Sequence, residues 1–290
     1  MGSGSWDTSS FKSYTTSTRG ASATFDKSGA IVTDMSNQDM FKARNLDEAL
    51  NPNGVTRECR DSEEHPNTIP VILALDVTGS MGEAAVEVAK KINVIMTELY
   101  EKISDVEFMI MGIGDFYCDS CPLQVSQFES DIRIAEQLDK LYFEFGGGGN
   151  IYESYTAAWY FGSRHCKLDC WERGKKGIII TMGDECINPY IPKCGSDASI
   201  KGVIGDDVQS DIQTDDLYKE TIEKFDVYHL HVNHGSNWNE SAVNKSWKEY
   251  LDDKHFRTVN LNSIANEIVD IISESINQPE SVNNTEGISW

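Results

Sequence analysis

Apolar residues along the chain are grouped in short runs that alternate with amphipathic segments. The runs at 69–75, 106–113 and 177–181 are continuous, and they have the length of strands buried on both faces. Residues 123–128 alternate between apolar and polar, which is typical of an edge strand or a hairpin. The full set of predicted strands is 69–75, 106–113, 123–128, 177–181, 226–232 and 256–260.

Apolar residues recur at helical spacing in the segments between these strands. In the clearest case, residues 83–103, they form one face of an amphipathic helix. The predicted helices are 83–103, 131–142, 152–165, 214–224, 240–252 and 263–276. Strands that alternate with helices indicate βαβ units joined by right-handed crossovers. We therefore predict an α/β fold: a doubly wound, mostly parallel, Rossmann-like sheet with helices on both faces.

The remaining segments lie at the two ends and in one long loop. Residues 1–66 are rich in Ser, Thr, Gly and Asp and show no sustained periodicity, so we expect an irregular N-terminal arm with a short helical turn at 45–50. Residues 67–277 form the predicted domain, and 278–290 form a C-terminal tail. The segment 183–214 is a long polar loop, and loops of this length are usually functional or disordered.

The chain of 290 residues has an ordinary hydrophobic content of 39%, but 25 Lys+Arg against 47 Asp+Glu give a net charge of −22. A field of this sign repels nucleic-acid phosphates and anionic membrane surfaces, and it attracts cations and basic partners. Neither nucleic acid nor membrane is therefore an expected partner. The sequence has no apolar stretch of the roughly 20 residues that cross a bilayer, and it does not begin with a secretory signal. We expect a cytoplasmic location.

The seven cysteines are an odd number, which argues against a closed disulfide framework. Cys118 and Cys121, like Cys166 and Cys170, have spacings that a structural Zn²⁺ site could use. Buried free thiols are also common as small apolar groups. We favour this second interpretation.

Three oxygen-bearing side chains follow the first buried strand at alternate positions: Asp76, Thr78 and Ser80. In a doubly wound sheet the ligand binds beyond the carboxyl ends of the strands. Oxygen ligands suit Mg²⁺, with Mn²⁺ or Ca²⁺ as alternatives. Ser80 and Glu83 also form the capping box S-x-x-E, which would satisfy the start of the next helix without any metal. Both interpretations stay open on these residues alone.

The segment PVILALDVTGSMG resembles the first strand and metal-binding loop of von Willebrand factor A domains, whose signature is D-x-[ST]-x-S. The resemblance covers residues 68–276. The segments GGGGNIYESYTAAWYFGSRH and RGKKGIIITMGDE are similar to a branch of the family found in bacteria and their phages. The resemblance implies a bound cation whose coordination is completed by an Asp or Glu of a protein partner. It therefore implies a protein-binding module and not an enzyme. The expected location is the cytoplasm or a phage particle.

The chain departs from the family pattern in two loops. A Thr of the second loop is absent, and Asn150 and Glu153 are the oxygen donors available there. In the third loop Met182 stands at the usual Asp position, and Asp184 follows two residues later. Asp115 is a further acid at the end of the second strand. The predicted metal ligands are Asp76, Thr78, Ser80, Asp115, Asn150, Glu153 and Asp184.

Three functions follow from these observations. The first is a metal-dependent protein-binding module that acts as an adaptor or assembly component. The second is a structural phage or assembly protein that keeps the fold without a working metal site. The third and least favoured is a serine hydrolase, because the segment 78–82 around Ser80 nearly matches G-x-S-x-G. His229 and His231 alternate within a predicted strand, so we expect them to be packed residues and not ligands.

Overall fold

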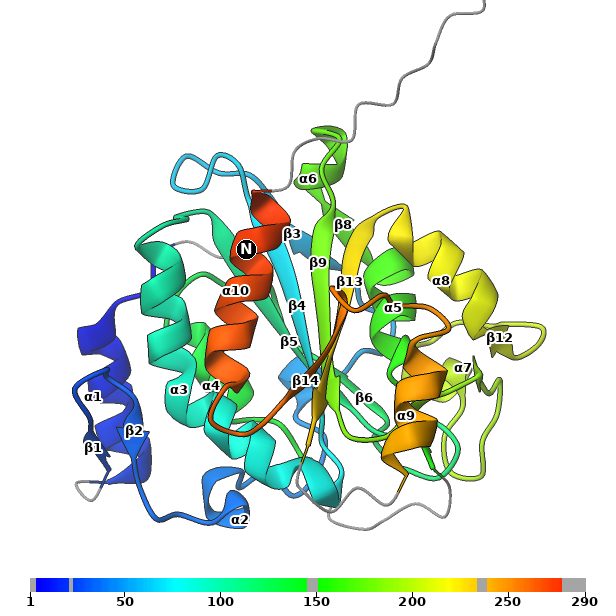
Figure 1. Ribbon diagram of the computed structural model, residues 1–290, viewed down its shortest axis with the longest axis horizontal. Helices are drawn as coiled ribbons and strands as arrows, with labels where there is room; N and C mark the ends of the chain where they lie inside the picture. Colours follow the sequence, from blue (N-terminus) through cyan, green and yellow to red (C-terminus); the bar gives the residue numbers. More distant parts are fainter. Residues whose placement is uncertain (1–3, 21–22, 145–150, 234–238, 278–290) are drawn as a thin grey trace, which may run out of the picture.

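The computed structural model describes residues 4–20, 23–144, 151–233 and 239–277. Its centre is a six-stranded sheet with the order β14-β13-β9-β4-β5-β6 (Figure 1). All neighbours in the sheet are parallel except β6, which runs antiparallel to β5. Counted along the chain from the β6 edge, the order is 3-2-1-4-5-6, the doubly wound arrangement. The predicted fold class is confirmed. The strands are β4 (Ile69–Asp76), β5 (Val106–Ile113), β6 (Leu123–Val125), β9 (Gly177–Gly183), β13 (Phe225–Val232) and β14 (Phe256–Val259).

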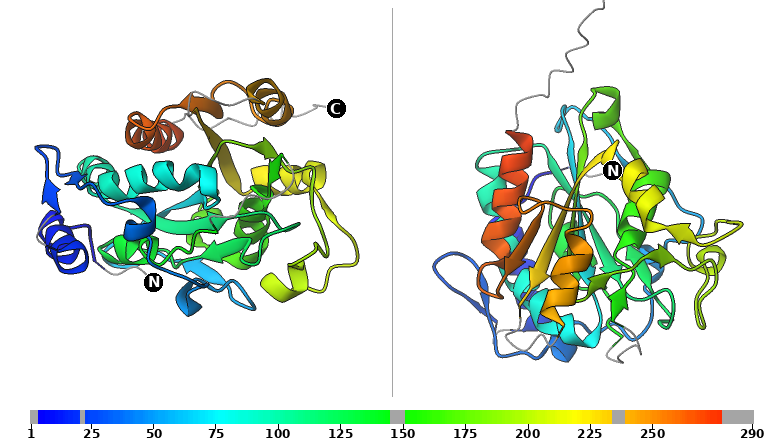
Figure 2. Two further views of the ribbon diagram at one scale, coloured as in Figure 1. Left: turned by 90° about the horizontal axis from the view of Figure 1, so that it is seen from below. Right: turned by 45° about the vertical axis from the view of Figure 1, so that its right-hand side comes forward.

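The continuous apolar runs form the middle of the sheet because both of its faces are covered. Alternate residues of β4 point to two separate cores: Val71, Leu73 and Leu75 to one, Ile72 and Ala74 to the other. The first core is closed by α3 (Gly82–Tyr100), α4 (Arg133–Leu138) and α10 (Ile264–Ile276). The second is closed by α5 (Thr156–His165), α8 (Thr214–Ile222) and α9 (Glu240–Trp247) (Figures 1 and 2).

The N-terminal arm is more regular than we expected, because Thr8–Arg19 is a helix, α1. Asp7 caps it by accepting a hydrogen bond from the Ser10 amide at 2.7 Å. Only Phe11 and Thr15 are buried, so the Ser- and Thr-rich sequence carries almost no helical signal. The turn expected at 45–50 is present as the 3₁₀ turn η1 (Glu48–Leu50). The other elements of the arm are β1 (Thr24–Phe25), β2 (Ile31–Val32), α2 (Asn37–Met40) and β3 (Arg57–Cys59).

Short elements occupy the long loops at the edges of the sheet. The helix expected at 152–165 begins only at Thr156, since β7 (Tyr152–Glu153) pairs in parallel with β10 (Cys186–Ile187). In the described part of the chain no helix is long and apolar enough to cross a membrane. The remaining elements are β8 (Cys166–Leu168), α6 (Asp169–Glu172), β11 (Tyr190–Ile191), α7 (Ile200–Val203) and β12 (Ile212–Gln213).

Candidate metal centre at the carboxyl end of the sheet

The central strand β4 ends at Asp76, whose side chain is completely buried. The Thr78 amide and hydroxyl both donate to Asp76 Oδ1, at 2.9 and 2.6 Å, which closes a tight turn before the 3₁₀ turn η2 (Gly79–Met81). The exposed Ser80 hydroxyl donates to Asp184 Oδ1 at 3.1 Å. The loops after β4 and β9 are therefore held together by side chains that the sequence predicted as metal ligands.

The capping-box interpretation of Ser80 is wrong. Helix α3 begins after Met81, and neither η2 nor α3 has a side-chain cap among the described residues. The Ser80 hydroxyl bonds to a carboxylate of another loop in place of a backbone amide of the helix. Ser80 is thus oriented toward the rim of the sheet.

Glu153 is a buried carboxylate with no basic partner in the described residues. Its exposed fraction is 8%, and its Oε2 has no hydrogen-bond partner in the described chain. Burial raises the pKa of Glu153 strongly, and the neighbouring Asp76, Asp119 and Asp115 carboxylates raise it further. Within the described ranges neither Glu153 nor Asp76 forms an ion pair with a Lys, Arg or His. The negative charge of this cluster is therefore not offset by a basic side chain of these ranges.

The same physics applies to Asp76. Burial raises the pKa of this carboxyl group first, and the nearby Asp184 carboxylate raises it further. The hydrogen bonds from Thr78 and Tyr155 act in the opposite direction. Bringing several acids together at a buried position is costly unless a cation or protons neutralise them.

Tyr155 is a site residue that our sequence analysis did not identify. Its fully buried hydroxyl donates to Asp76 Oδ2 at 2.8 Å and accepts a hydrogen bond from the Glu185 amide at 3.2 Å. The absence of a side chain at Gly183 creates the room, because a Cβ there would lie 2.0 Å from the Tyr155 hydroxyl oxygen. No local sequence pattern signals this contact, since Tyr155, Asp76 and Glu185 lie in separate segments of the chain.

Asp115 lies on the same rim, but its carboxylate serves its own loop. Its Oδ1 accepts hydrogen bonds from the Tyr117 amide at 3.0 Å and from the Ser154 hydroxyl at 3.1 Å. Its backbone amide donates to Asp119 Oδ2 at 2.7 Å. Asp115 thus contributes negative charge near Glu153 and also orders the loop after β5. Asn150, the remaining predicted ligand, lies outside the described residues.

The donor set of this rim fits a hard divalent cation. Asp76, Thr78, Ser80, Glu153 and Asp184 offer carboxylate and hydroxyl oxygens, and the Glu153 Oε2 is buried without a partner. Oxygen ligands of this kind suit Mg²⁺, Mn²⁺ and Ca²⁺. No group of three or more His, Cys, Asp or Glu side chains in the described chain is already arranged as a metal-binding cluster. A site here would therefore depend on hydroxyl ligands or water as well as carboxylates.

The other candidate ligands are far from such a role. Cys118 and Cys121 follow β5, whereas Cys166 and Cys170 lie in β8 and α6, at the opposite end of the sheet (Figure 1). These four thiols do not form one Zn²⁺ site. The packing prediction for the two histidines is confirmed: both are fully buried in β13, and the His229 ring stacks on Trp247 with a centroid distance of 3.6 Å.

The doubly wound sheet, the D-x-T-x-S loop at the end of its central strand and the helix that follows are the arrangement implied by the resemblance in the sequence. The chain has a von Willebrand A-type fold. No protein-family model and no curated protein matches the sequence.

Several solved structures are similar to this chain. The pilus adhesin SpaC from Lactobacillus rhamnosus GG aligns over 77% of this chain and 31% of its own, with 13% identity and a TM-score of 0.49. The vWF domain of the type V pili tip protein Mfa5 from Porphyromonas gingivalis aligns over 73% and 97%, with 13% identity and a TM-score of 0.46. The conserved hypothetical protein BatB from Bacteroides thetaiotaomicron aligns over 72% and 100%, with 16% identity and a TM-score of 0.40. This chain thus spans about a third of SpaC, and likenesses at this level concern the fold alone.

Proposed function

We propose that the protein is a non-enzymatic module that binds a protein partner through a divalent cation at the carboxyl end of its sheet. The observation that carries this proposal is Glu153: a buried carboxylate with an unpartnered oxygen, beside the buried Asp76 and with no basic side chain of the described ranges to offset it. A buried charge without a partner is retained only where something else compensates it.

Five side chains would hold Mg²⁺, Mn²⁺ or Ca²⁺ at this rim: Asp76, Thr78, Ser80, Glu153 and Asp184. When bound, the cation supplies a Lewis acid that can accept a carboxylate oxygen from another protein. Ser80 is exposed, so the site reaches the protein surface. The hydroxyl of Tyr155 orients Asp76 from the buried side.

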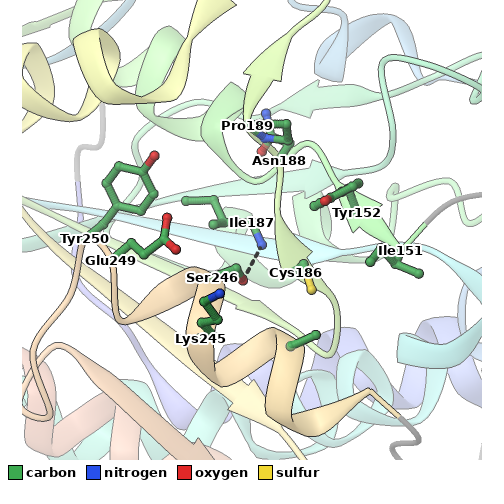
Figure 3. A pocket seen from close by; sticks show the side chains of 11 residues that line it. Ile151, Tyr152, Cys186, Ile187, Asn188, Pro189, Lys245, Ser246, Glu249 and Tyr250 are labelled. Carbon is green, nitrogen blue, oxygen red and sulfur yellow. Dashed lines mark hydrogen bonds between the residues drawn. The ribbon is translucent and has the colours of Figure 1, made fainter.

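The surface beside the site suits a protein partner. Three tyrosines are exposed in segments that connect the main strands: Tyr117 after β5, Tyr152 in β7 and Tyr190 in β11. Tyr152 directly precedes Glu153 and lines a pocket of about 260 Å³ between β7, β10 and α9 (Figure 3). Tyrosine is enriched in protein interfaces, because it combines a large contact area with a polar end.

Two other functions are less well supported. A structural component without a metal would have to keep Glu153 protonated, and its buried Oε2 would still have no hydrogen-bond partner in the described chain. For a serine hydrolase, Ser80 would need a base, but in the described residues its hydroxyl bonds to Asp184 and to no histidine. The adaptor role and the origin in a phage or a cell stay predictions.

Titration with Mg²⁺ and with Mn²⁺ tests the metal, with binding followed by calorimetry and by the melting temperature. We expect saturable stabilisation that Asp76→Asn and Ser80→Ala abolish. Asp76→Asn retains the size of the side chain and Ser80 is exposed, so both variants should fold. Glu240→Gln, an exposed acid at the start of α9, is the matched control and should leave metal binding unchanged. Binding that is the same in all four proteins would refute the site.

A displayed library of random peptides tests the partner. We expect peptides selected in Mg²⁺ to share an Asp or Glu and to dissociate in excess chelator. They should also fail to bind Asp76→Asn. If metal binds but selected peptides are retained in chelator, the partner proposal is wrong while the metal site stands.

A further inference from the structure

The arginines of this acidic protein are paired with carboxylates almost without exception. All eight lie in the described residues, and six of them form ion pairs with Asp or Glu: Arg19, Arg60, Arg133, Arg164, Arg173 and Arg257. Arg44 is exposed to solvent. Arg57 is the exception, because it is buried and has no carboxylate partner in the described chain.

Arg57 lies at the start of β3, with an exposed fraction of 6%. Its Nη2 donates to the backbone oxygens of Ala49 and Val125, both at 3.0 Å, which joins η1 to the edge strand β6. Its Nε is buried and has no hydrogen-bond partner in the described residues. A guanidinium has five N–H donors and no acceptor, so two backbone carbonyls leave most of its capacity unused.

Arg19 shows how this protein otherwise treats a buried arginine. Its side chain is also only 6% exposed, and it pairs with Asp139, which accepts a further hydrogen bond from the Tyr14 hydroxyl. Burial lowers the pKa of Arg57, which means that its charged form is disfavoured where it stands. The missing counter-charge is therefore specific to the Arg57 position.

Arg57 lines a pocket of about 340 Å³ between the arm and α4. Other donors line the same pocket: the Gln127 side chain and the exposed Lys140, which forms no ion pair with the described residues. Arg133 also lines it but is already paired with Glu129 and Asp131. Two carboxylates, Glu48 and Glu136, also line the pocket.

We propose that this pocket binds a small organic oxyanion, with its anionic group held by Arg57 and assisted by Lys140. The pocket has the volume of a small-molecule site, and guanidinium is the side chain best suited to carboxylate and phosphate oxygens. The ligand is either a carboxylic acid or a phosphate ester, because the two share this chemistry. The net charge of −22 repels anions in general, so binding requires this specific buried cation and not the surface field.

Nuclear magnetic resonance of the arginine Nε–Hε groups tests the proposal on the wild-type chain, with inorganic phosphate and citrate as probes. We expect the Arg57 Nε resonance to shift saturably with at least one of them, while that of Arg19 stays in place. A response to phosphate alone identifies a phosphate ester as the natural ligand class, and a response to citrate alone identifies a carboxylic acid.

Arg57→Gln should weaken binding of the responding anion by about tenfold or more, because charge-assisted hydrogen bonds are lost. Arg60→Gln, three residues later and already paired with Asp169, is the matched control and should bind normally. Lys140→Gln, at an exposed position, should weaken binding by a smaller factor. The proposal is overturned if neither anion shifts the Arg57 resonance, or if chloride at equal ionic strength shifts it equally.

Discussion

The two ends of the central sheet each contain a buried glutamate with an unpartnered oxygen, and their surroundings differ. Glu107 lies near the amino end of β5 and is 1% exposed, and Glu153 lies at the carboxyl end and is 8% exposed. In the described chain the Oε2 atoms of both lack a hydrogen-bond partner. Burial raises the pKa of both carboxyl groups. What distinguishes them is the charge of their neighbours.

The neighbours of Glu107 partly offset its charge. Hydrogen bonding with Cys59 and the charge of His65 both lower the pKa of Glu107, against the effect of burial. The His65 ring nitrogens lie 3.1 Å from the Ser104 backbone oxygen and 2.7 Å from the Gly4 backbone oxygen. Both partners are backbone oxygens, which only accept hydrogen bonds.

The charged neighbours in the described chain that shift the pKa of Glu153 are acids, and they raise it. The comparison teaches that a buried carboxylate alone does not mark a metal site. A buried carboxylate indicates a metal site when the surrounding charges are also negative and oxygen donors from several loops lie close to it. Four experiments sharpen or break this distinction.

The largest expected effect concerns metal binding. Glu153→Gln should lose the stabilisation by Mg²⁺, which amounts to about 2.7 kcal/mol when the free metal is at 100 times its Kd. Glu107→Gln, the same change at the other end, should retain it. Unfolding by urea with and without Mg²⁺ measures both. If Mg²⁺ stabilises the two variants equally, the two ends of the sheet do not differ in metal binding.

The second effect tests the compensation at the amino end. His65→Ala removes the buried ring that contacts two backbone oxygens and lies near Glu107, so we expect a loss of about 1–3 kcal/mol in the free energy of unfolding. His255→Ala, which breaks a largely exposed contact with Asp252, should cost under about 1 kcal/mol. A small effect at His65 would mean that Glu107 is not compensated by this ring.

The third effect tests the buried support of Asp76. Tyr155→Phe removes a hydroxyl that donates to Asp76 and accepts from the Glu185 amide. We expect the free energy of unfolding to fall by about 1 kcal/mol. Tyr250→Phe removes an exposed bond to Asp215 and serves as the control, with a change near zero. Denaturant unfolding of the metal-free protein measures both variants.

The smallest effect is a dependence on pH. Because burial raises the pKa of Glu107 in the folded protein, the folded state binds its proton more tightly than the unfolded state does. Stability from this group is present below the ordinary pKa of glutamate and is lost as the pH rises through the raised value. Glu107→Gln should therefore show a shallower loss of stability with rising pH than the wild type. Parallel curves for the two proteins would contradict this.

The sequence predicted most of the fold because its signals are local. The runs that became β4 and β5 end within one residue of the predicted boundaries, since a strand buried on both faces needs an unbroken apolar stretch. Helix α1 was missed because only two of its residues are buried, and the pairing of β7 with β10 was missed because each strand has two residues.

By itself the sequence determined the order of strands and helices and the oxygen-rich loop at 76–80, because periodicity and motif spacing are properties of neighbouring residues. Only the tertiary structure decided which charges meet. It directed Ser80 to Asp184 and not to the helix start, joined Tyr155 to Asp76, and buried Glu153 among acids. It also left Arg57 without a carboxylate partner among the described residues. Electrostatic energies depend on distances and burial between residues that are remote in the chain, and local sequence patterns do not encode them.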